Sequence, residues 1–261
     1  SAYDKAEPGR YLAYPDVYIP AAPELVRLAC AAEPALQPVI CASADKFVAD
    51  PAAKTALHAR FGAEICEMEA AGIRYIGGAL YTYWPVDYSK PVDKPATRAR
   101  AVEGTARAAR IAQEYGITIG LEVMNRFEGY LINTAQECVD FIHDVGEDNV
   151  KVMLDTFHMN IEEDSFRQAI LTAGELLGHL HVGEANRRLP GQGRLPWDEI
   201  GGALQEIGYD GTVVMEPFIM EGGQIGQEVK VWRDLSAGAT VAQMDQMAAD
   251  SVRFLKEAWT R

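Results

Sequence analysis

Short apolar segments alternate with longer amphipathic segments along most of this sequence, at intervals of roughly 30 residues. The short segments have the pattern of β-strands, and six strands are expected at residues 36–42, 74–80, 117–123, 150–156, 177–184 and 212–218. Strands that alternate with helices pair in parallel, and eight such units in about 250 residues form a TIM (β/α)8 barrel. A doubly wound sheet is the alternative, but it does not bring residues from four successive strands to one point.

The longer segments are expected to form helices at residues 24–33, 51–72, 95–115, 134–145, 164–176, 196–207 and 241–259. Thr134 and Glu137 have the spacing of a capping box at one helix start. Residues 1–22 have no clear period, so an irregular start is expected. No Pro/Gly/Ser linker divides the chain, and residues 1–261 are therefore interpreted as a single (β/α) barrel domain.

Each of the last four expected strands carries one residue near its end that can bind a metal ion. In the strand at 117–123 the branched residues lie on one face and Glu122 lies on the other. The same alternation places Asp155 opposite Val150, Val152 and Leu154 and places His181 opposite Leu180 and Val182, and it puts Glu216 on one face with Val214. If those apolar faces pack on helices, all four side chains point into the barrel, where the C-terminal ends of strands form active sites.

Three carboxylates at one point would repel each other and raise each other's pKa, and a divalent cation removes that cost. Carboxylates with one imidazole suit Mn²⁺, Co²⁺ or Mg²⁺ and leave positions for a bidentate substrate. Taken singly, a carboxylate near a strand end is more often a cap or a surface charge. His179 alone is more often a hydrogen-bonded core histidine than a ligand. The matching positions on consecutive strands favour the metal site.

A second group of polar side chains follows the same strands and suits a polyhydroxylated ligand. It consists of Asn125, Arg126, Glu128, His158, Glu184 and Arg187. Aromatic residues follow the strand at 74–80, and their rings could stack on a sugar; these are Tyr81, Tyr83, Trp84 and Tyr88. Loop packing or a subunit interface explains the aromatic residues equally well.

The acidic composition argues against several classes of partner. With a net charge of -14 and a pI near 4.8, the chain lacks the excess of Lys and Arg that binding to nucleic acid needs. Its four cysteines include no C-x-x-C pair, which disfavours a zinc ribbon or a disulfide framework and favours a cytoplasmic location. No apolar run reaches the roughly 18 residues that span a bilayer, so no membrane association is expected.

Five stretches contain most of these polar and aromatic residues: 77–88 (GGALYTYWPVDY), 122–128 (EVMNRFE), 150–163 (VKVMLDTFHMNIEE), 181–188 (HVGEANRR) and 213–218 (VVMEPF). In these stretches the sequence resembles the ketose 3-epimerases, a family that includes D-tagatose, D-allulose (D-psicose) and L-ribulose 3-epimerases. The similar stretches extend over about 140 residues, which is far more specific than a short motif. The resemblance implies a xylose-isomerase-like TIM barrel.

The resemblance also implies roles for individual residues. The metal ligands of the family match Glu122, Asp155, His181 and Glu216. The two glutamates of this set match the pair that exchanges protons at C3 of a free ketose. Substrate-holding positions match Glu128, His158 and Arg187, and Trp84 is expected to bind substrate beside them. The family requires Mn²⁺, Co²⁺ or Mg²⁺ and no organic cofactor, and it suggests a homodimer or homotetramer.

The implied chemistry agrees with the residue types. Inverting C3 beside a carbonyl needs a base on one face and an acid on the other, through a metal-stabilised enediolate. The expected substrates are D-fructose/D-allulose, D-tagatose/D-sorbose or L-ribulose/L-xylulose. The alternatives are an aldose-ketose isomerase, a metal-dependent endonuclease and a catalytically inactive sugar-binding protein.

The start of the chain departs from the family, whose members begin with a strand, a helix and a second strand. Residues 1–35 do not have that apolar pattern. Either about thirty residues precede Ser1 in the natural chain, or the start is divergent, because a barrel without two strands would expose an apolar seam.

Overall fold

The structure is a computed structural model of the chain, and it describes residues 74–83, 86–89 and 91–260, apart from the side chains of 223–225. The described residues all belong to one compact unit, Arg74–Arg261. The strand expected at 36–42, the helices expected at 24–33 and 51–72 and the irregular start lie outside the described residues. The interpretation of the whole chain as one domain therefore stays a prediction.

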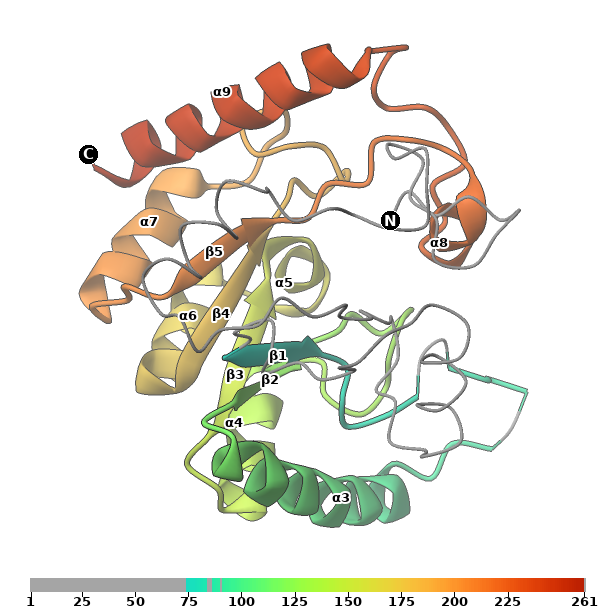
Figure 1. The fold of residues 1–261 in the computed structure, drawn as a ribbon, viewed down its shortest axis with the longest axis vertical. Helices are drawn as coiled ribbons and strands as arrows, with labels where there is room; N and C mark the ends of the chain where they lie inside the picture. Colours follow the sequence, from blue (N-terminus) through green and yellow to red (C-terminus); the bar gives the residue numbers. More distant parts are fainter. Residues whose placement is uncertain (1–73, 84–85, 90, 261) are drawn as a thin grey trace, which may run out of the picture. The chain divides into compact units, whose positions relative to one another are not determined.

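The centre of the described chain is a parallel five-stranded sheet in which each strand pairs with the next one in the sequence (Figure 1). Its strands are β1 (Tyr75–Gly78), β2 (Thr118–Glu122), β3 (Val150–Asp155), β4 (Leu177–Val182) and β5 (Thr212–Met215). Five of the six expected strands are confirmed, and each lies within the segment predicted for it. Successive parallel strands require crossover connections on the face of the sheet.

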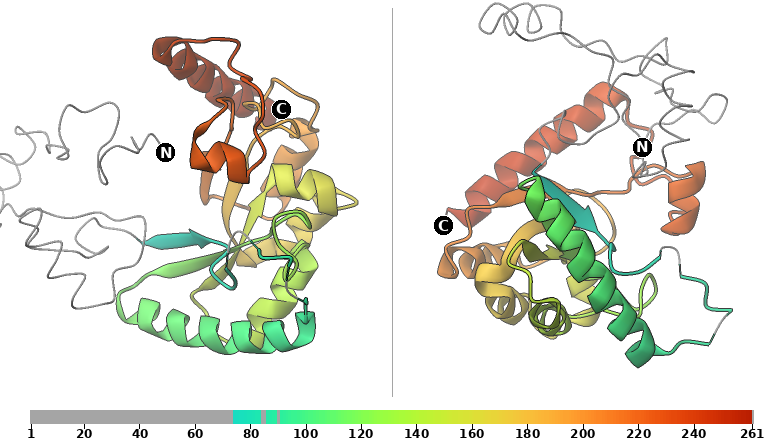
Figure 2. Two further views of the ribbon diagram at one scale, coloured as in Figure 1. Left: turned by 90° about the vertical axis from the view of Figure 1, so that its right-hand side faces the viewer. Right: turned by 60° about the horizontal axis from the view of Figure 1, so that its bottom comes forward.

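Helices supply these crossovers and lie along the outer side of the curved sheet, as the two views in Figure 2 show. Five of them correspond to predicted helices: α3 (Lys94–Glu114), α4 (Ala135–Val145), α6 (Phe166–Ala173), α7 (Trp197–Glu206) and α9 (Val241–Trp259). The helix predicted at 164–176 ends at Ala173 and continues as a 3₁₀ turn, Gly174–Leu176. Two short helices were not predicted, α5 (Thr156–Glu162) and α8 (Gly223–Glu228). Within the described ranges, the helices lack the combination of length and apolar character that crossing a membrane requires.

The core lies between the sheet and the helices. Val150, Val152 and Leu154 alternate along β3 and are fully buried. They belong to one cluster with buried helix residues such as Phe141 of α4 and Ile170 of α6. Each of these side chains contributes roughly 1.5–3 kcal/mol by leaving water. Because this face is fixed against the helices, the opposite face of each strand is directed to the barrel interior.

Side-chain caps define where the helices begin. Thr134 caps α4, and its Oγ1 accepts a hydrogen bond from Glu137 N at 3.2 Å. The other half of the predicted capping box differs, because Glu137 Oε2 accepts from Asn133 N at 2.7 Å, one residue before the cap. A complete capping box is present at α9, between Thr240 and Gln243.

A bulge in β4 sets the register of the two strands that carry Asp155 and His181. Pairing between β3 and β4 is regular except at Gly178, which stands as an extra residue between two pairs. Beyond the bulge Asp155 pairs with His181. A Cβ at position 178 would lie 2.6 Å from Lys151 Cβ, so this position requires glycine.

Candidate metal centre

The C-terminal ends of four neighbouring strands bring the four candidate ligands together. Glu122 and Asp155 end β2 and β3, His181 is the penultimate residue of β4, and Glu216 directly follows β5. One ligand atom of each residue lies within 4.8 Å of the others. Strand alternation thus predicted where these side chains meet, although they come from four separate segments.

His181 lies at the centre of the cluster. Its Nδ1 is 3.6 Å from Glu122 Oε1, 3.7 Å from Asp155 Oδ2 and 3.6 Å from Glu216 Oε1. These distances are too long for hydrogen bonds, and Nδ1 is buried without a hydrogen-bond partner. Ligand atoms about 2.1 Å from one ion lie roughly 3.0 Å apart when adjacent and roughly 4.2 Å apart when opposite. The four side chains therefore fit a divalent ion between them.

Burial and mutual charge shift the pKa values in this cluster. Burial raises the pKa of Asp155 to about 6, and the Glu216 and Glu122 carboxylates add to this shift. Burial alone would lower the pKa of His181, but Glu122 and Glu216 outweigh it and raise that pKa to about 10. Burial would raise the pKa of Glu216, yet His181 and Arg187 bring it below its ordinary value. The carboxylates therefore favour positive charge at their centre, which a divalent cation supplies.

Asp155 has a separate task for each carboxylate oxygen. Its Oδ1 accepts hydrogen bonds from Phe157 N at 2.6 Å and His158 N at 3.3 Å, and thereby caps α5. Its Oδ2 remains directed toward His181 at 3.7 Å. Because the cap fixes the orientation of the carboxylate, the second oxygen is held in a position suitable for a ligand.

Glu128, His158 and Arg187, the predicted substrate-holding residues, lie beside the cluster, and Asn125 orients two of them. Asn125 Nδ2 lies 2.9 Å from Glu128 Oε1 and 2.7 Å from His158 Nδ1. The backbone N of Asn125 also donates to His158 Nδ1, at 3.3 Å. Since Nδ1 accepts, the imidazole proton is assigned to Nε2, which lies 3.8 Å from Glu122 Oε1.

The Arg187 guanidinium closes one side of the cluster and is almost completely buried. Its Nη1 lies 3.3 Å from Glu216 Oε2, and its Nη2 lies 3.4 Å from Glu128 Oε1. The ring centroids of Phe157 and Phe218 lie 3.6 and 4.9 Å from Arg187 Cζ. Both rings attract the cation through their faces. Sequence reasoning missed this role of Phe157, and its position directly before His158 was the only available signal.

The aromatic residues that follow β1 have different environments. Tyr81 is buried and donates its hydroxyl to the Glu122 carbonyl oxygen at 2.8 Å, so it supports β2 and does not face a sugar. Tyr83 and Tyr88 are about half exposed. Trp84 lies outside the described residues, and its sugar-stacking role stays a prediction.

His179 lies in the layer of the barrel interior below the ligands. Its side chain is only partly buried, and its contacts among the described residues are with aromatic rings, so the expected hydrogen-bonded core position is not confirmed. Its ring stacks on Tyr75 and meets His181 edge-on, with 5.1 Å between the ring centroids in both pairs. Burial and the neighbouring His181 lower the pKa of His179, which favours its neutral form.

A parallel sheet with connecting helices and with metal-binding side chains at its strand ends is typical of one class of TIM barrels. The family model described as "Xylose isomerase-like TIM barrel" matches residues 6–257. The chain belongs to this family, and the predicted fold class is confirmed.

Several ketose 3-epimerases are similar to this chain over most of its length. A D-psicose 3-epimerase of Agrobacterium fabrum is 56% identical over 205 residues, which cover 78% of this chain and 71% of the relative. A crystal structure of D-psicose 3-epimerase in the presence of D-fructose has 58% identity and a TM-score of 0.71, covering 72% of this chain and 65% of that one. The enzyme from Clostridium cellulolyticum H10 with D-tagatose has 56% identity and a TM-score of 0.70, covering 71% and 64%. Within the barrel family, the chain thus belongs to the ketose 3-epimerases, and it spans about two thirds of these relatives' length.

Proposed function

We propose that this chain is an isomerase that inverts C3 of free ketoses with the help of a divalent metal ion. The observation that carries the proposal is the meeting of four ligand atoms within 4.8 Å, around a buried His181 Nδ1 without a hydrogen-bond partner. The likeness to D-psicose 3-epimerases supports the reaction class.

Glu122, Asp155, His181 and Glu216 would hold the ion, which we propose to be Mn²⁺, Co²⁺ or Mg²⁺. When bound, the ion polarises the C2 carbonyl and stabilises negative charge on the substrate oxygens. The proton transfers require only carboxylates, so an organic cofactor is not needed.

Glu122 and Glu216 are the proposed proton-transfer pair. They come from β2 and from the end of β5, with β3 and β4 between them, and can approach a substrate from two sides. One carboxylate removes the C3 proton, which leaves an enediolate, and the other group, as a carboxylic acid, returns a proton to the opposite face. The first glutamate is then protonated and the second ionised, and proton exchange with water restores the starting state.

Glu128, His158 and Arg187 are proposed to hold the hydroxyl groups of the sugar. His158 Nε2 and the Arg187 nitrogens are donors, whereas Glu128 is an acceptor. Arg187 is already shared between Glu128 and Glu216. A phosphate group would therefore meet more carboxylates than cations among the described residues, which favours an unphosphorylated substrate.

The first substrates to test are D-fructose and D-allulose (D-psicose), followed by D-tagatose/D-sorbose and L-ribulose/L-xylulose. The ketoses named with the two crystal structures, D-fructose and D-tagatose, motivate this order. We further propose that Trp84 adds a stacking surface for the sugar and that the protein is a cytoplasmic homodimer or homotetramer.

A proton-exchange assay tests the proposed function. The chain, loaded separately with Mn²⁺, Co²⁺ or Mg²⁺, is incubated with each ketose in D₂O, and products are analysed by NMR. We expect the C3 epimer with deuterium at C3. Deuterium only at C1 or C2 would identify an aldose-ketose isomerase, and calorimetric binding without conversion would identify a sugar-binding protein.

A further inference from the structure

We propose that Glu184 is a positioning residue that holds Arg187 in the site, an inference that rests on the proposed function. Glu184 is fully buried, two residues after the end of β4. A buried carboxylate is costly unless its oxygens are satisfied by hydrogen bonds. The groups around the Glu184 carboxylate therefore indicate the role of this residue.

The carboxylate of Glu184 accepts hydrogen bonds from four N–H groups of the segment that leads into α7. Oε1 accepts from Gly191 N at 2.8 Å and Trp197 Nε1 at 2.7 Å. Oε2 accepts from Arg194 N at 2.9 Å and Leu195 N at 3.1 Å. Three of these donors are backbone groups, so the bonds fix the path of the chain rather than single side chains.

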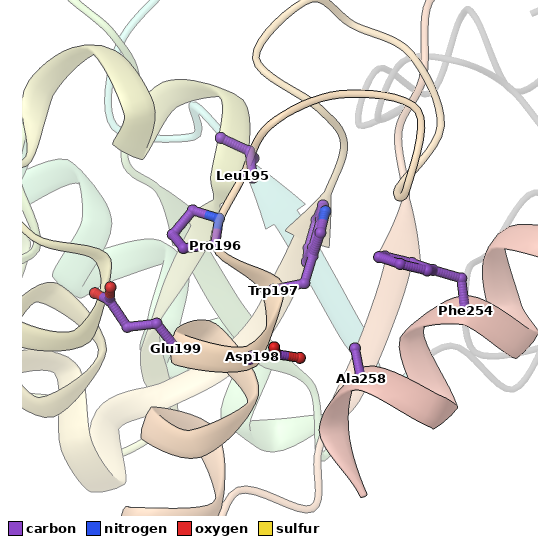
Figure 3. Close-up of a pocket in the computed structure, with 7 residues that line it drawn as sticks. All are labelled: Leu195, Pro196, Trp197, Asp198, Glu199, Phe254 and Ala258. Atoms are coloured by element: carbon purple, nitrogen blue, oxygen red, sulfur yellow. The ribbon is translucent and has the colours of Figure 1, made fainter. Parts of the chain in front are cut away.

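The segment closes tightly around the carboxylate. A Cβ added at Gly193 would overlap the Glu184 carboxylate, so only glycine allows the chain to pass there. On the other side, Leu195 and Trp197 border a cavity of about 330 Å³, across which Phe254 and Ala258 of α9 lie (Figure 3). Trp259 Nε1 of α9 donates to Trp197 O at 3.1 Å on that side, so the four hydrogen bonds to Glu184 and this one restrain the segment together.

The backbone of Glu184 forms the turn that presents Arg187. Glu184 N donates to Arg188 O at 2.9 Å, and Arg187 N donates to Glu184 O at 2.8 Å. Arg187 has a φ of 61°, a left-handed conformation that costs roughly 1–2 kcal/mol in a non-glycine residue. Such a conformation persists only where the surrounding contacts enforce it.

Arg187 needs this support because its side chain reaches the reacting groups. The guanidinium contacts Glu216 and Glu128 and lies over the rings of Phe157 and Phe218. A rotation of the 184–188 turn would move the guanidinium away from both carboxylates, and displacements of about 1 Å at such sites can reduce rates about 100-fold. The Glu184 carboxylate is hydrogen-bonded to the segment before α7 and to none of the candidate ligands, so it acts through Arg187.

The test uses Glu184→Gln, which keeps the shape but places an NH₂ group against two of the N–H donors. We expect about a tenfold fall in kcat/KM, mainly through a higher KM, because Arg187 is proposed to bind substrate. In the double variant Glu184→Gln/Arg187→Ala, the fall in kcat/KM should equal the fall in Arg187→Ala alone within about twofold. Losses that multiply would overturn the proposal. The matched control is Glu175→Gln, at an exposed glutamate before the start of β4. We expect its kinetics to be unchanged.

A second readout does not depend on epimerase activity. Phenylglyoxal modification of arginines, followed by peptide mass spectrometry, should find Arg187 protected in the parent chain and at least about fivefold more reactive in Glu184→Gln. Arg167, which is half exposed, is the internal reference. Unchanged Arg187 reactivity in a folded Glu184→Gln chain would refute the positioning role. A parent chain without activity but with the expected reactivity change would refute only the proposed function.

Trp197→Phe is the milder variant if Glu184→Gln does not fold. It removes one of the four donors and keeps the aromatic packing. We expect about a threefold rise in KM and an intermediate Arg187 reactivity, against no change in Trp232→Phe, whose indole is largely exposed. Parent-like values of both readouts in Trp197→Phe would contradict the proposal.

Discussion

The two glutamates proposed to exchange protons differ in exposure, because the Glu216 side chain is 32% exposed and the Glu122 side chain only 13%. Glu216 is also held by Arg187, whereas Glu122 faces the imidazole of His158. Two carboxylates in unlike surroundings are suited to unlike roles, as acid–base catalysis on opposite faces requires. We infer that Glu216 exchanges its proton with water more readily.

Glu122→Gln and Glu216→Gln are each expected to reduce kcat by at least about 10³-fold, because an amide can neither take nor return the C3 proton. Circular dichroism and thermal melting should find the fold retained. Glu221→Gln, at an exposed glutamate after β5, is the control with normal turnover. A fully active Glu216→Gln enzyme would exclude the two-carboxylate mechanism.

Phe157→Leu is expected to weaken the contacts that hold the Arg187 guanidinium, without changing a candidate metal ligand. The lost ring-cation attraction is about 0.5–2 kcal/mol, which corresponds to about a 2- to 30-fold higher KM. Steady-state kinetics measure it, and Phe127→Leu, at a largely exposed ring, should leave KM unchanged. Equal KM values for the two variants would remove Phe157 from the support of Arg187.

At the scale of elements, β3 and α5 follow each other without a loop, and Asp155 ends the one and caps the other. Because Asp155 caps α5, this short helix, which was not predicted from the sequence, begins directly at the site. The bulge at Gly178 acts at the same level, since it determines which residue of β4 lies opposite Asp155.

Asp155→Asn separates the two tasks of this residue. Asparagine caps helices about as well as aspartate, so the melting temperature without metal should change little. The loss of charge should weaken binding of Mn²⁺ at least about tenfold, measured by calorimetry. Wild-type metal affinity in this variant would exclude Asp155 as a ligand.

Gly178→Ala is expected to destabilise the protein by about 1–3 kcal/mol, because the new methyl group meets Lys151. Gly104→Ala in α3 is the matched control, since a Cβ there meets nothing within 4 Å. It should stabilise the protein by about 1 kcal/mol through helix propensity. Denaturant unfolding compares the two, and equal effects would contradict the close approach at the bulge.

At the scale of the whole molecule, the candidate metal centre joins four strands that form sheet hydrogen bonds only with their neighbours in the sheet. Its residues come from β2, β3, β4 and the end of β5. An ion bound there adds a cross-link at the C-terminal edge of the sheet. Since an ion that binds only the folded chain stabilises it by mass action, thermal stability reports on the centre.

Adding Mn²⁺ at about 100 times its Kd should stabilise the chain by about 2.7 kcal/mol, and EDTA should reverse the effect. Differential scanning calorimetry measures both steps. The increase should be strongly reduced in His181→Ala, which lacks the central ligand. The same increase in His181→Ala and in the parent would place the ion elsewhere.

The alternation of branched and polar residues is a local property of the chain, and it was sufficient to predict the described strands and the meeting of Glu122, Asp155, His181 and Glu216. Within each strand, successive side chains point to opposite faces of the sheet, and this alternation does not depend on the neighbouring strand. The 36–42 strand and Trp84 lie outside the described residues and stay predictions.

Contacts between distant segments decided the rest. Gly178 is an extra residue only because of how β3 and β4 pack, and Arg187 adopts its left-handed conformation only within the turn at Glu184. Phe157 becomes a support for Arg187 because α5 begins directly at Asp155. Register, backbone strain and ring contacts depend on partners far away in the sequence, and so the tertiary structure alone determined how the site is held together.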